Sequence, residues 1–281
     1  MLRTMITASN TMTQLQQQLD TISNNIANSS TSGYKAKQAS FSEMLYQQYN
    51  NDQLDKAERQ SPVGIRYGVG AMLGQIQTNH VQGSLQQTER SLDFALTKEK
   101  QYFNILMPDG ENGQKMVYSR QGDFYVSPIN NGQVMLVNAD GYPVADSNGQ
   151  AITFPSNMSD FSVTADGTLT VQYPDGNPSQ SFQLGITRLN KPQVMEHVSG
   201  TYIGLPTNLA ALGYTEGDII TNLQGGNRAE VSVVNGSLEM SNVNLSKEMT
   251  NLIQTQRSYQ FNARAVTLAD QMMGLINGIR G

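Results

Sequence analysis

Apolar residues near the start of the chain follow a helical spacing. Between Met5 and Ile26 they are separated alternately by three and four residues, the alternation found along a coiled-coil seam. At about 1.5 Å per residue, a helix over this stretch would be about 33 Å long. The apolar seam consists of Met5, Ala8, Met12, Leu15, Leu19, Ile22 and Ile26.

The other faces of this predicted helix are polar but almost uncharged. Thr, Ser, Asn and Gln fill them, and Asp20 is the one ionisable residue between Met5 and Ile26. A coiled coil that faces water usually carries Glu and Lys beside its seam, and an unpaired charge is costly inside protein. The pattern therefore favours a helix surrounded by other protein; the alternative is the core face of an ordinary domain.

The last forty residues return to a helical spacing and carry two apolar stripes. No proline occurs from Asn242 to Gly281, and no glycine before Gly274. Two stripes require neighbours on two faces, and a partner helix from the N-terminus accounts for one. The first stripe is Leu245, Met249, Leu252, Tyr259, Ala263 and Val266, with Gln256 in its gap; the second is Phe261, Ala265, Leu268, Met272, Leu275 and Ile279.

The unpaired stripe predicts self-association. Burial of the seven N-terminal seam residues contributes roughly 10–20 kcal/mol as an upper bound, but a two-helix module leaves its outer apolar surface wet and is poorly ordered alone. Identical copies would complete the packing, and a head-to-tail contact that does not close on itself gives a helical filament. The N-terminal seam, the first C-terminal stripe and Leu268, Met272 and Leu275 of the second are thus the predicted polymerisation seam.

Between the helices the period of the pattern changes to two. Short alternations from about Val69 to Met240 are separated by Asn-Gly or Asp-Gly dipeptides, which predicts an antiparallel, all-β middle domain. The dipeptides used here are at residues 131–132, 140–141, 148–149, 166–167, 175–176 and 235–236. The expected strands are Tyr102–Met107, Met116–Ser119, Phe124–Val126, Val134–Val137, Phe161–Thr164, Leu169–Tyr173, Phe182–Thr187 and Val231–Val234.

The parity of apolar positions predicts one hairpin with a three-residue loop. The apolar residues of FSVTADGTLTVQY are all odd-numbered. They share a face only if Val163 opposes Leu169, because side chains alternate between the two faces of a strand. We therefore expect a loop of residues 165–167 with Gly167 in the left-handed region.

A second hairpin is predicted in EVSVVNGSLEM. Here Val231 and Val233 are odd-numbered, whereas Leu238 and Met240 are even-numbered. A shared face then requires Val233 to oppose Leu238. The expected connection is a two-residue type I′ turn at Asn235-Gly236.

These patterns together predict an α+β fold in three parts. Residues 1–34 and 242–281 form a coiled-coil-like helical core, residues 35–68 a linker or extended segment, and residues 69–241 a β-rich outer domain. Gln and Asn dominate the linker, which we expect to acquire order against a partner.

Composition excludes several classes of protein. The 281-residue chain has a net charge of −5 and a pI near 5.0, without a Lys/Arg cluster, which argues against nucleic-acid binding. The sequence contains no run of about 18 apolar residues, so it does not predict membrane insertion. The first residues lack the apolar region of a secretory signal peptide. Cysteine is absent, which excludes disulfides and thiolate ligands.

Catalysis and cofactor binding are not favoured. Paired carboxylates could hydrolyse glycosides, but most acidic residues of the middle domain lie in turn dipeptides, where Asp suits the backbone. No spacing typical of a metal site occurs, and we expect no cofactor. The residues considered were Asp140, Asp146, Asp160, Asp166, Asp175, His80 and His197. An adhesin or phage-tail-like fibre is another alternative, although those proteins usually have a single stalk at one end.

Both ends of the chain resemble one known family. LDTISNNIANSSTSGYKAKQASFSEML is similar to the N-terminal signature of bacterial flagellar basal-body rod and hook proteins, close to N-x-A-N-x-x-T-x-G-Y/F-K, and the C-terminal segment SNVNLSKEMTNLIQTQRSYQFNARAVTLADQMM resembles the closing helix of that family. The chain has no large central insertion, and in this respect it resembles distal-rod-type subunits, including the rod-like proteins of Gram-positive flagella. The motif residues are Asn25, Ala27, Asn28, Thr31, Gly33, Tyr34 and Lys35. For Asn25, Asn28, Tyr34 and Lys35, the sequence leaves open whether they serve recognition or helix termination and loop geometry.

The resemblance implies a structural subunit of the flagellar rod and not an enzyme. Such a subunit would polymerise through its terminal helices into a hollow helical tube in the basal body. Its partners would be itself, neighbouring rod and hook proteins and the flagellar type III export apparatus, which it would pass unfolded and without a cleaved signal peptide. No nucleic acid and no membrane insertion are expected.

One segment departs from the family pattern. Relatives often follow L-D-F-A-L with a glycine-containing turn before an aromatic strand. This chain has Thr97-Lys98-Glu99-Lys100-Gln101-Tyr102 there, without glycine. The type of this turn is left open by the sequence.

Overall fold

The computed structural model describes residues 2–43, 47–49, 65–67, 71–110, 113–129, 132–174 and 178–280. The chain divides into two compact units. The helical unit comprises Met1–Ala27, Lys37–Gln77 and Asn244–Gly281, and the β unit comprises Asn28–Ala36 and Thr78–Val243. The predicted α+β class, with helices at both ends and a mostly antiparallel β middle, is confirmed.

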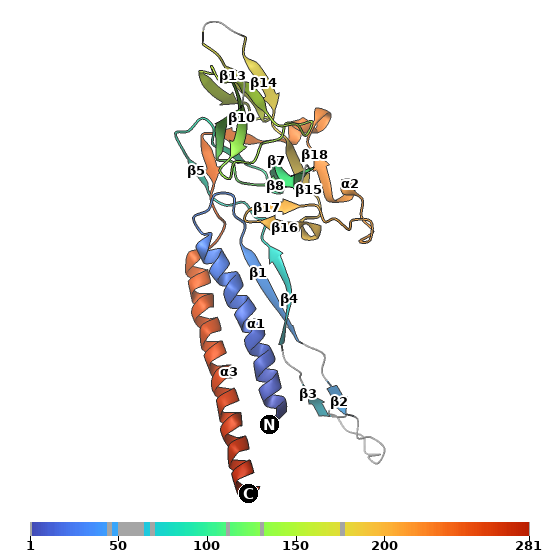
Figure 1. Ribbon diagram of the computed structural model, residues 1–281, viewed down its shortest axis with the longest axis vertical. Helices are drawn as coiled ribbons and strands as arrows, with labels where there is room; N and C mark the ends of the chain where they lie inside the picture. The colour runs from blue at the N-terminus through green and yellow to red at the C-terminus, as the bar shows by residue number, and fades with distance from the viewer. Residues whose placement is uncertain are drawn as a thin grey trace. The chain divides into compact units, whose positions relative to one another are not determined.

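Two long helices lie side by side and antiparallel in the helical unit (Figure 1). Helix α1 (Leu2–Ala27) has 26 residues and helix α3 (Leu245–Arg280) has 36. At about 1.5 Å per residue they are about 39 and 54 Å long. Asn244 caps α3, because its side-chain oxygen accepts a hydrogen bond from the Lys247 N–H at 3.0 Å.

The same unit contains two short strand pairs. Strand β1 (Lys37–Glu43) pairs with β4 (Ala71–Thr78), and β2 (Gln47–Tyr49) pairs antiparallel with β3 (Ile65–Tyr67). The Leu73 N–H of β4 donates to the side-chain oxygen of Gln14 on α1 at 2.7 Å. Within the segment predicted as a linker, the described residues are therefore largely extended strands.

The β unit is built around a six-stranded sheet with the order β16-β17-β8-β7-β15-β18. These strands are Glu196–Ser199, Tyr202–Gly204, Gly113–Ser119, Gln101–Asp109, Ile186–Leu189 and Ile220–Asn222. Its neighbouring strands pair antiparallel throughout the described residues. A short helix, α2 (Glu216–Ile219), leads into β18.

Smaller antiparallel sheets complete the β unit. One has the order β11-β10-β9 (Thr153–Pro155, Gln133–Asn138, Phe124–Pro128) and another β12-β13-β14 (Asp160–Val163, Thr168–Gln172, Gln180–Gln183). Two strand pairs are β19-β6 (Val233–Asn235, Phe94–Leu96) and β20-β5 (Ser237–Glu239, Leu85–Gln87). Short 3₁₀ turns lie at Pro192–Val194 and Gly225–Glu230.

Aromatic residues form the centre of the main core of the β unit. Phe94, Phe103 and Phe124 are fully buried, and the ring of Phe124 lies 5.6 Å from that of Phe94 and 5.2 Å from that of Phe103. These tilted and edge-on arrangements are favourable for aromatic pairs. Apolar residues from the three larger sheets and from the β19–β6 pair surround them, so the predicted alternation marks the true core side of most strands.

Six of the eight expected strands coincide with observed ones, Val231–Val234 overlaps β19 only at Val233 and Val234, and the remaining one is divided. The expected strand Phe182–Thr187 is split into β14 and β15. Gly185 lies between them, and a Cβ there would be 2.6 Å from the Asp146 carbonyl oxygen. The chain crosses another backbone segment at this glycine, and the close approach interrupts the strand.

The first predicted hairpin is confirmed. Val163 lies opposite Leu169 in the β12–β13 register. Gly167 has φ +77°, the left-handed conformation that the three-residue loop requires.

The second predicted hairpin is wrong. Strands β19 and β20 do not pair with each other: β19 pairs with β6, and β20 pairs with β5. The chain bends at Gly236 (φ +62°) and continues instead of reversing. The buried positions stay odd-numbered through the bend, at Val231, Val233, Ser237 and Glu239, whereas Leu238 and Met240 are half-buried.

Candidate assembly site

The predicted seam of α1 is the covered side of that helix. Ala8 and Ile22 are buried, and the other five seam residues are half-buried. The opposite side exposes residues such as Ser9, Gln16 and Ser23, none of them charged. Among the residues of α1 whose exposure is described, Asp20 is the one charged residue on the exposed faces and Ile6, at 58% accessible, the one large apolar residue.

The first stripe of α3 is only partly covered. Leu252, Tyr259, Ala263 and Val266 are half-buried, whereas Leu245 and Met249 are exposed. The buried positions of α3 are Thr255 and Ala269. A threonine at a covered position has no apolar signal, which is why the sequence pattern did not indicate it.

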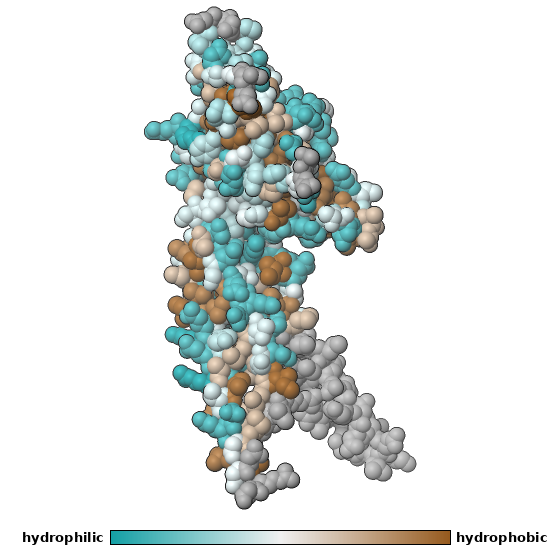
Figure 2. Space-filling model, viewed as in Figure 1, coloured by the Kyte–Doolittle hydropathy of each residue, from teal (hydrophilic) through white to brown (hydrophobic). Residues whose placement is uncertain are grey.

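The second stripe of α3 is exposed. Phe261, Leu268 and Leu275 are 75, 57 and 68% accessible, and Ala265 and Met272 are also exposed; the side chain of Ile279 lies outside the described residues. Apolar side chains are visible on the surface of the helical unit (Figure 2). Within the described residues, this row is an apolar face that the chain itself leaves uncovered.

Asn25 joins the end of α1 to strand β1. Its side-chain nitrogen donates to the Lys37 carbonyl at 2.8 Å, and its side-chain oxygen accepts from the Lys37 N–H at 2.9 Å. The amide therefore acts like one residue of a neighbouring strand. Only asparagine or glutamine offers a donor and an acceptor in this planar arrangement, so Asn25 has a structural role here.

The motif residues from Asn28 to Lys35 form a turn in the β unit. The Thr31 hydroxyl donates to the Asn28 side-chain oxygen at 3.3 Å, which ends the helical path; both residues are half-buried, whereas Ala27 at the helix end is exposed. Gly33 has φ +69°, and its N–H donates to the Glu239 carbonyl at 2.7 Å. Tyr34 beside it is buried.

Lys35 belongs to a buried charge network with Glu239 and Arg120. The Lys35 ammonium donates to Glu239 Oε1 at 2.5 Å and to the Val81 carbonyl at 2.8 Å. The Arg120 Nε donates to Glu239 Oε2 at 2.7 Å, and a terminal nitrogen of Arg120 also contacts that oxygen. All three side chains are almost fully buried.

Backbone carbonyls satisfy the remaining donors of Arg120. Its guanidinium donates to the carbonyls of Lys98, Gln101 and Leu96 at 2.7, 2.9 and 3.0 Å. Burial, with the nearby Arg120 charge, lowers the pKa of Lys35 below its usual value. The network holds together segments from residue 35 to residue 239, and the sequence pattern identified only Lys35 among its three members.

The segment that departs from the family pattern contains a strained residue. Lys100 has φ +61°, and among the described residues it is the only non-glycine with positive φ. Its carbonyl accepts a hydrogen bond from the Leu189 N–H at 2.8 Å. The turn therefore keeps a left-handed position although no glycine occupies it, at a cost of about 1–2 kcal/mol.

The histidines have structural partners. His80 Nδ1 lies 2.7 Å from the Tyr102 hydroxyl, and burial lowers the pKa of His80 to about 4. His197 Nε2 lies 3.1 Å from the Thr78 hydroxyl. In the described part of the chain, no group of three His, Cys, Asp or Glu residues could hold a metal ion, and no described helix is long and apolar enough to cross a bilayer.

The Asp residues considered for catalysis serve the turns. The Asp146 carboxylate accepts from the N–H groups of Asn148 and Gln150, both at 2.8 Å. Asp166 accepts from the Thr168 N–H at 3.2 Å, and hydrogen bonding, chiefly from the Thr164 hydroxyl, lowers the pKa of Asp166. Asp140 contacts the Tyr202 hydroxyl, and Asp160 accepts from the Phe161 N–H at 2.7 Å. Asp175 lies outside the described residues.

The chain joins a β unit to a pair of terminal helices that leave one apolar face uncovered. This arrangement is typical of structural proteins that self-assemble. Three family models match the chain: "Flagella basal body rod protein" at residues 5–35, "Flagellar hook protein FlgE/F/G D1 domain" at 99–171, and "Flagellar basal body rod FlgEFG protein C-terminal" at 234–279. The two terminal matches cover most of both long helices and the motif turn.

Relatives that align over nearly their whole length indicate the same family. The chain is 44% identical to the flagellar hook-basal body complex protein FlhP of Bacillus subtilis (strain 168), over 100% of both chains. It is 30% identical to the flagellar basal-body rod protein FlgG of the same organism, over 97% of both, and 31% identical to FlgG of Caulobacter vibrioides, over 98% of both. The chain therefore belongs to the flagellar basal-body rod and hook protein family, whose members are structural proteins of the flagellar basal body and not enzymes.

Proposed function

We propose that this chain is an axial subunit that polymerises through α1 and α3 into a hollow helical tube. The observation that carries the proposal is the exposed row Phe261, Leu268, Met272 and Leu275 on α3. Monomeric soluble proteins rarely leave such an apolar face uncovered. Neighbouring copies and adjoining rod and hook proteins cover it in the assembled tube.

The helix pair of one subunit is only part of this packing. The covered faces of α1 and α3 follow the three-and-four spacing of a coiled coil, and the second stripe of α3 extends the same geometry to a neighbour. Among the residues of α1 whose exposure is described, only Asp20 is both exposed and charged, which suits enclosure because contact with another copy buries few charges there. In this arrangement the terminal helices form the axial core of the tube, and the β unit faces outward.

Export through the flagellar type III apparatus fits the same proposal. The chain would pass unfolded and without a cleaved signal peptide, and its helices would become ordered on assembly. Burial between subunits would then offset the conformational entropy lost on ordering.

The polymerisation seam can be tested with polar substitutions on the exposed row. We expect the double variant Leu268→Gln/Leu275→Gln to remain folded, because both side chains are already exposed. Each leucine buried between subunits contributes roughly 1.5–3 kcal/mol, so the critical concentration should rise about 100-fold or more. Sedimentation and negative-stain microscopy of concentrated full-length protein measure this rise.

The matched control is Gln260→Ala/Gln271→Ala, which changes exposed positions of α3 outside the stripe. It should polymerise like the wild type. Unchanged polymerisation of the leucine variant, or of a chain that lacks its terminal helices, would contradict the proposal.

A further inference from the structure

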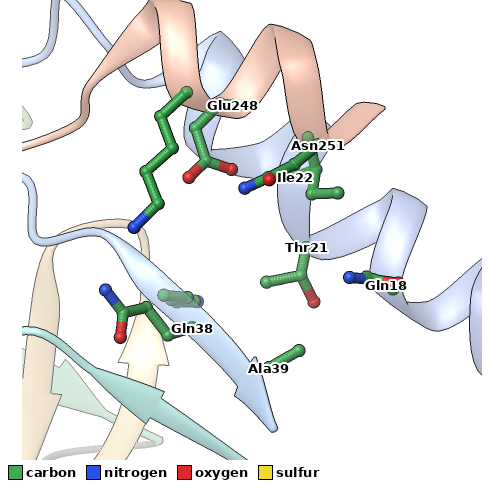
Figure 3. A pocket seen from close by; sticks show the side chains of 9 residues that line it. Gln18, Thr21, Ile22, Gln38, Ala39, Glu248 and Asn251 are labelled. Atoms are coloured by element: carbon green, nitrogen blue, oxygen red, sulfur yellow. The ribbon is translucent and has the colours of Figure 1, made fainter. Parts of the chain in front are cut away.

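A polar cavity of about 220 Å³ lies in the helical unit between α1, β1 and the first turns of α3. Gln18 and Thr21 line it from α1, Gln38 from β1, and Glu248 and Asn251 from α3 (Figure 3). The remaining lining residues are Ile22, Lys37, Ala39 and Lys247. We call this cavity the lysine pocket.

Two ammonium groups in this pocket have no partner. Among the described residues, neither Lys37 nor Lys247 makes a side-chain hydrogen bond or ion pair. Lys37 is half-buried, and burial lowers its pKa, whereas Lys247 is exposed at the rim. A partly desolvated ammonium group without a counter-ion is unfavourable, so the pocket favours an anion.

The pocket supplies only one negative charge of its own. Glu248 is its only acidic lining residue, and one oxygen of that carboxylate accepts from the Asn25 amide at 3.4 Å. The lining therefore carries one excess positive charge. The amides of Gln18 and Asn251 add neutral hydrogen-bond donors around the space.

The size and chemistry of the space suit a carboxylate side chain. A water molecule occupies about 30 Å³ in the liquid, so an Asp or Glu side chain fits with a few waters. Lys–carboxylate hydrogen bonds are charge-assisted and fix the position of the incoming group. The chain offers many such groups, with 23 acidic residues against 18 Lys and Arg.

We propose that in the polymer the lysine pocket receives a carboxylate side chain of a second copy of this chain. The proposal rests on the polymerisation proposed above, because the pocket and the exposed row of α3 belong to the same helical unit. The apolar row supplies most of the contact energy but is uniform along the helix. The charged contact fixes the axial register of one copy against the next and disfavours slipped arrangements.

Zero-length cross-linking with a carbodiimide tests this contact. The reagent joins a lysine amine to a carboxylate in direct contact as an amide, with loss of water. Polymer made from equal amounts of ¹⁴N- and ¹⁵N-labelled full-length chains is cross-linked, digested and analysed by mass spectrometry. We expect mixed-label peptides that join Lys247 or Lys37 to an Asp or Glu of another copy.

Two variants make the test independent of folding. Lys247→Arg keeps the charge but cannot form the amide, so it should polymerise normally and lose the Lys247 cross-link. Lys247→Glu should raise the critical concentration roughly tenfold, because the incoming carboxylate then meets like charge. The control Lys115→Glu, on β8 of the β unit, should have no effect.

The outcomes separate this contact from the proposed function. Wild-type polymer whose pocket lysines cross-link only within their own chain, together with unchanged polymerisation of Lys247→Glu, would overturn the contact alone. Cross-links from these lysines to a different axial protein would also overturn it. Wild-type chains that never polymerise would overturn the proposed function and the contact together.

Discussion

Glu239 is the residue on which several distant segments of the β unit depend. Its carboxylate forms ion pairs with both Lys35 and Arg120 and also accepts the Gly83 N–H at 2.9 Å, while its own carbonyl accepts the Gly33 N–H at 2.7 Å. Buried ion pairs add little net stability, but removal of one partner leaves the other charge buried and unpaired. Here one removal would affect two cations.

We therefore expect Glu239→Gln to destabilise the β unit by about 3–5 kcal/mol. The substitution preserves shape, so the loss would come from the charge. Urea unfolding of the full-length protein, followed by tyrosine fluorescence, measures it. The control is Glu230→Gln, which removes an exposed ion pair with Arg188 and should change stability by about 0–1 kcal/mol. Equal effects of the two substitutions would contradict this account.

Lys35 was found from a family signature, whereas Arg120 and Glu239 could not be found from the pattern. Periodicity marks apolar residues, and it assigned the core side of β20 to Leu238 and Met240. The true core side carries Glu239, because its charge is compensated by partners more than 100 residues away in the chain. Such compensation is a property of the folded chain and has no local signal.

At the level of elements, helices and hairpins were predictable where the local pattern and the tertiary environment agree. The register at Val163 and Leu169 follows from parity, since both residues pack on the core. The Asn235-Gly236 turn failed because β6 and β5 provide partners for the two flanking strands. A turn dipeptide fixes a local φ, but the competing strands decide whether the chain reverses there.

The turn that follows α1 requires glycine for two separate reasons. Gly33 has φ +69°, and a Cβ there would lie 2.4 Å from the Gln121 nitrogen. Gly110 has a similar φ of +65° but nothing within 4 Å of an added Cβ. The two glycines therefore separate backbone strain from steric contact.

We expect Gly110→Ala to cost about 1 kcal/mol from its left-handed φ alone. Gly33→Ala should cost about 3 kcal/mol or more, because the backbone of Arg120 and Gln121 must also move. Chemical denaturation of both variants at the same protein concentration gives the comparison. Similar losses for the two would show that the close approach at Gly33 is unimportant.

At the scale of the whole molecule, the two units differ in how their apolar surface is covered. The β unit has a large buried core, whereas α3 exposes a full row of apolar side chains. Segments with few buried contacts open more easily than the core of a domain. The stability of the monomer is therefore expected to be uneven along the chain.

Limited trypsin digestion should reveal this difference. In dilute monomer we expect cleavage at Arg257 and Arg264, exposed on α3, well before cleavage at Lys35 and Arg120, which are buried. Polymerised protein should protect the two α3 sites, because neighbouring copies then cover the helix. Equal cleavage of all four sites in the monomer, or no protection in the polymer, would contradict the prediction.

The unequal lengths of the two long helices have a mechanical consequence. Helix α3 has 36 residues and α1 has 26, a difference of about 15 Å at about 1.5 Å per residue. In a polymer of such subunits, the ends of α1 and α3 would lie at different heights along the axis. The boundaries between successive subunits would therefore be staggered and would not fall in one plane. A torsional load would then be carried by helices that overlap along the axis, instead of by end-to-end contacts between subunits.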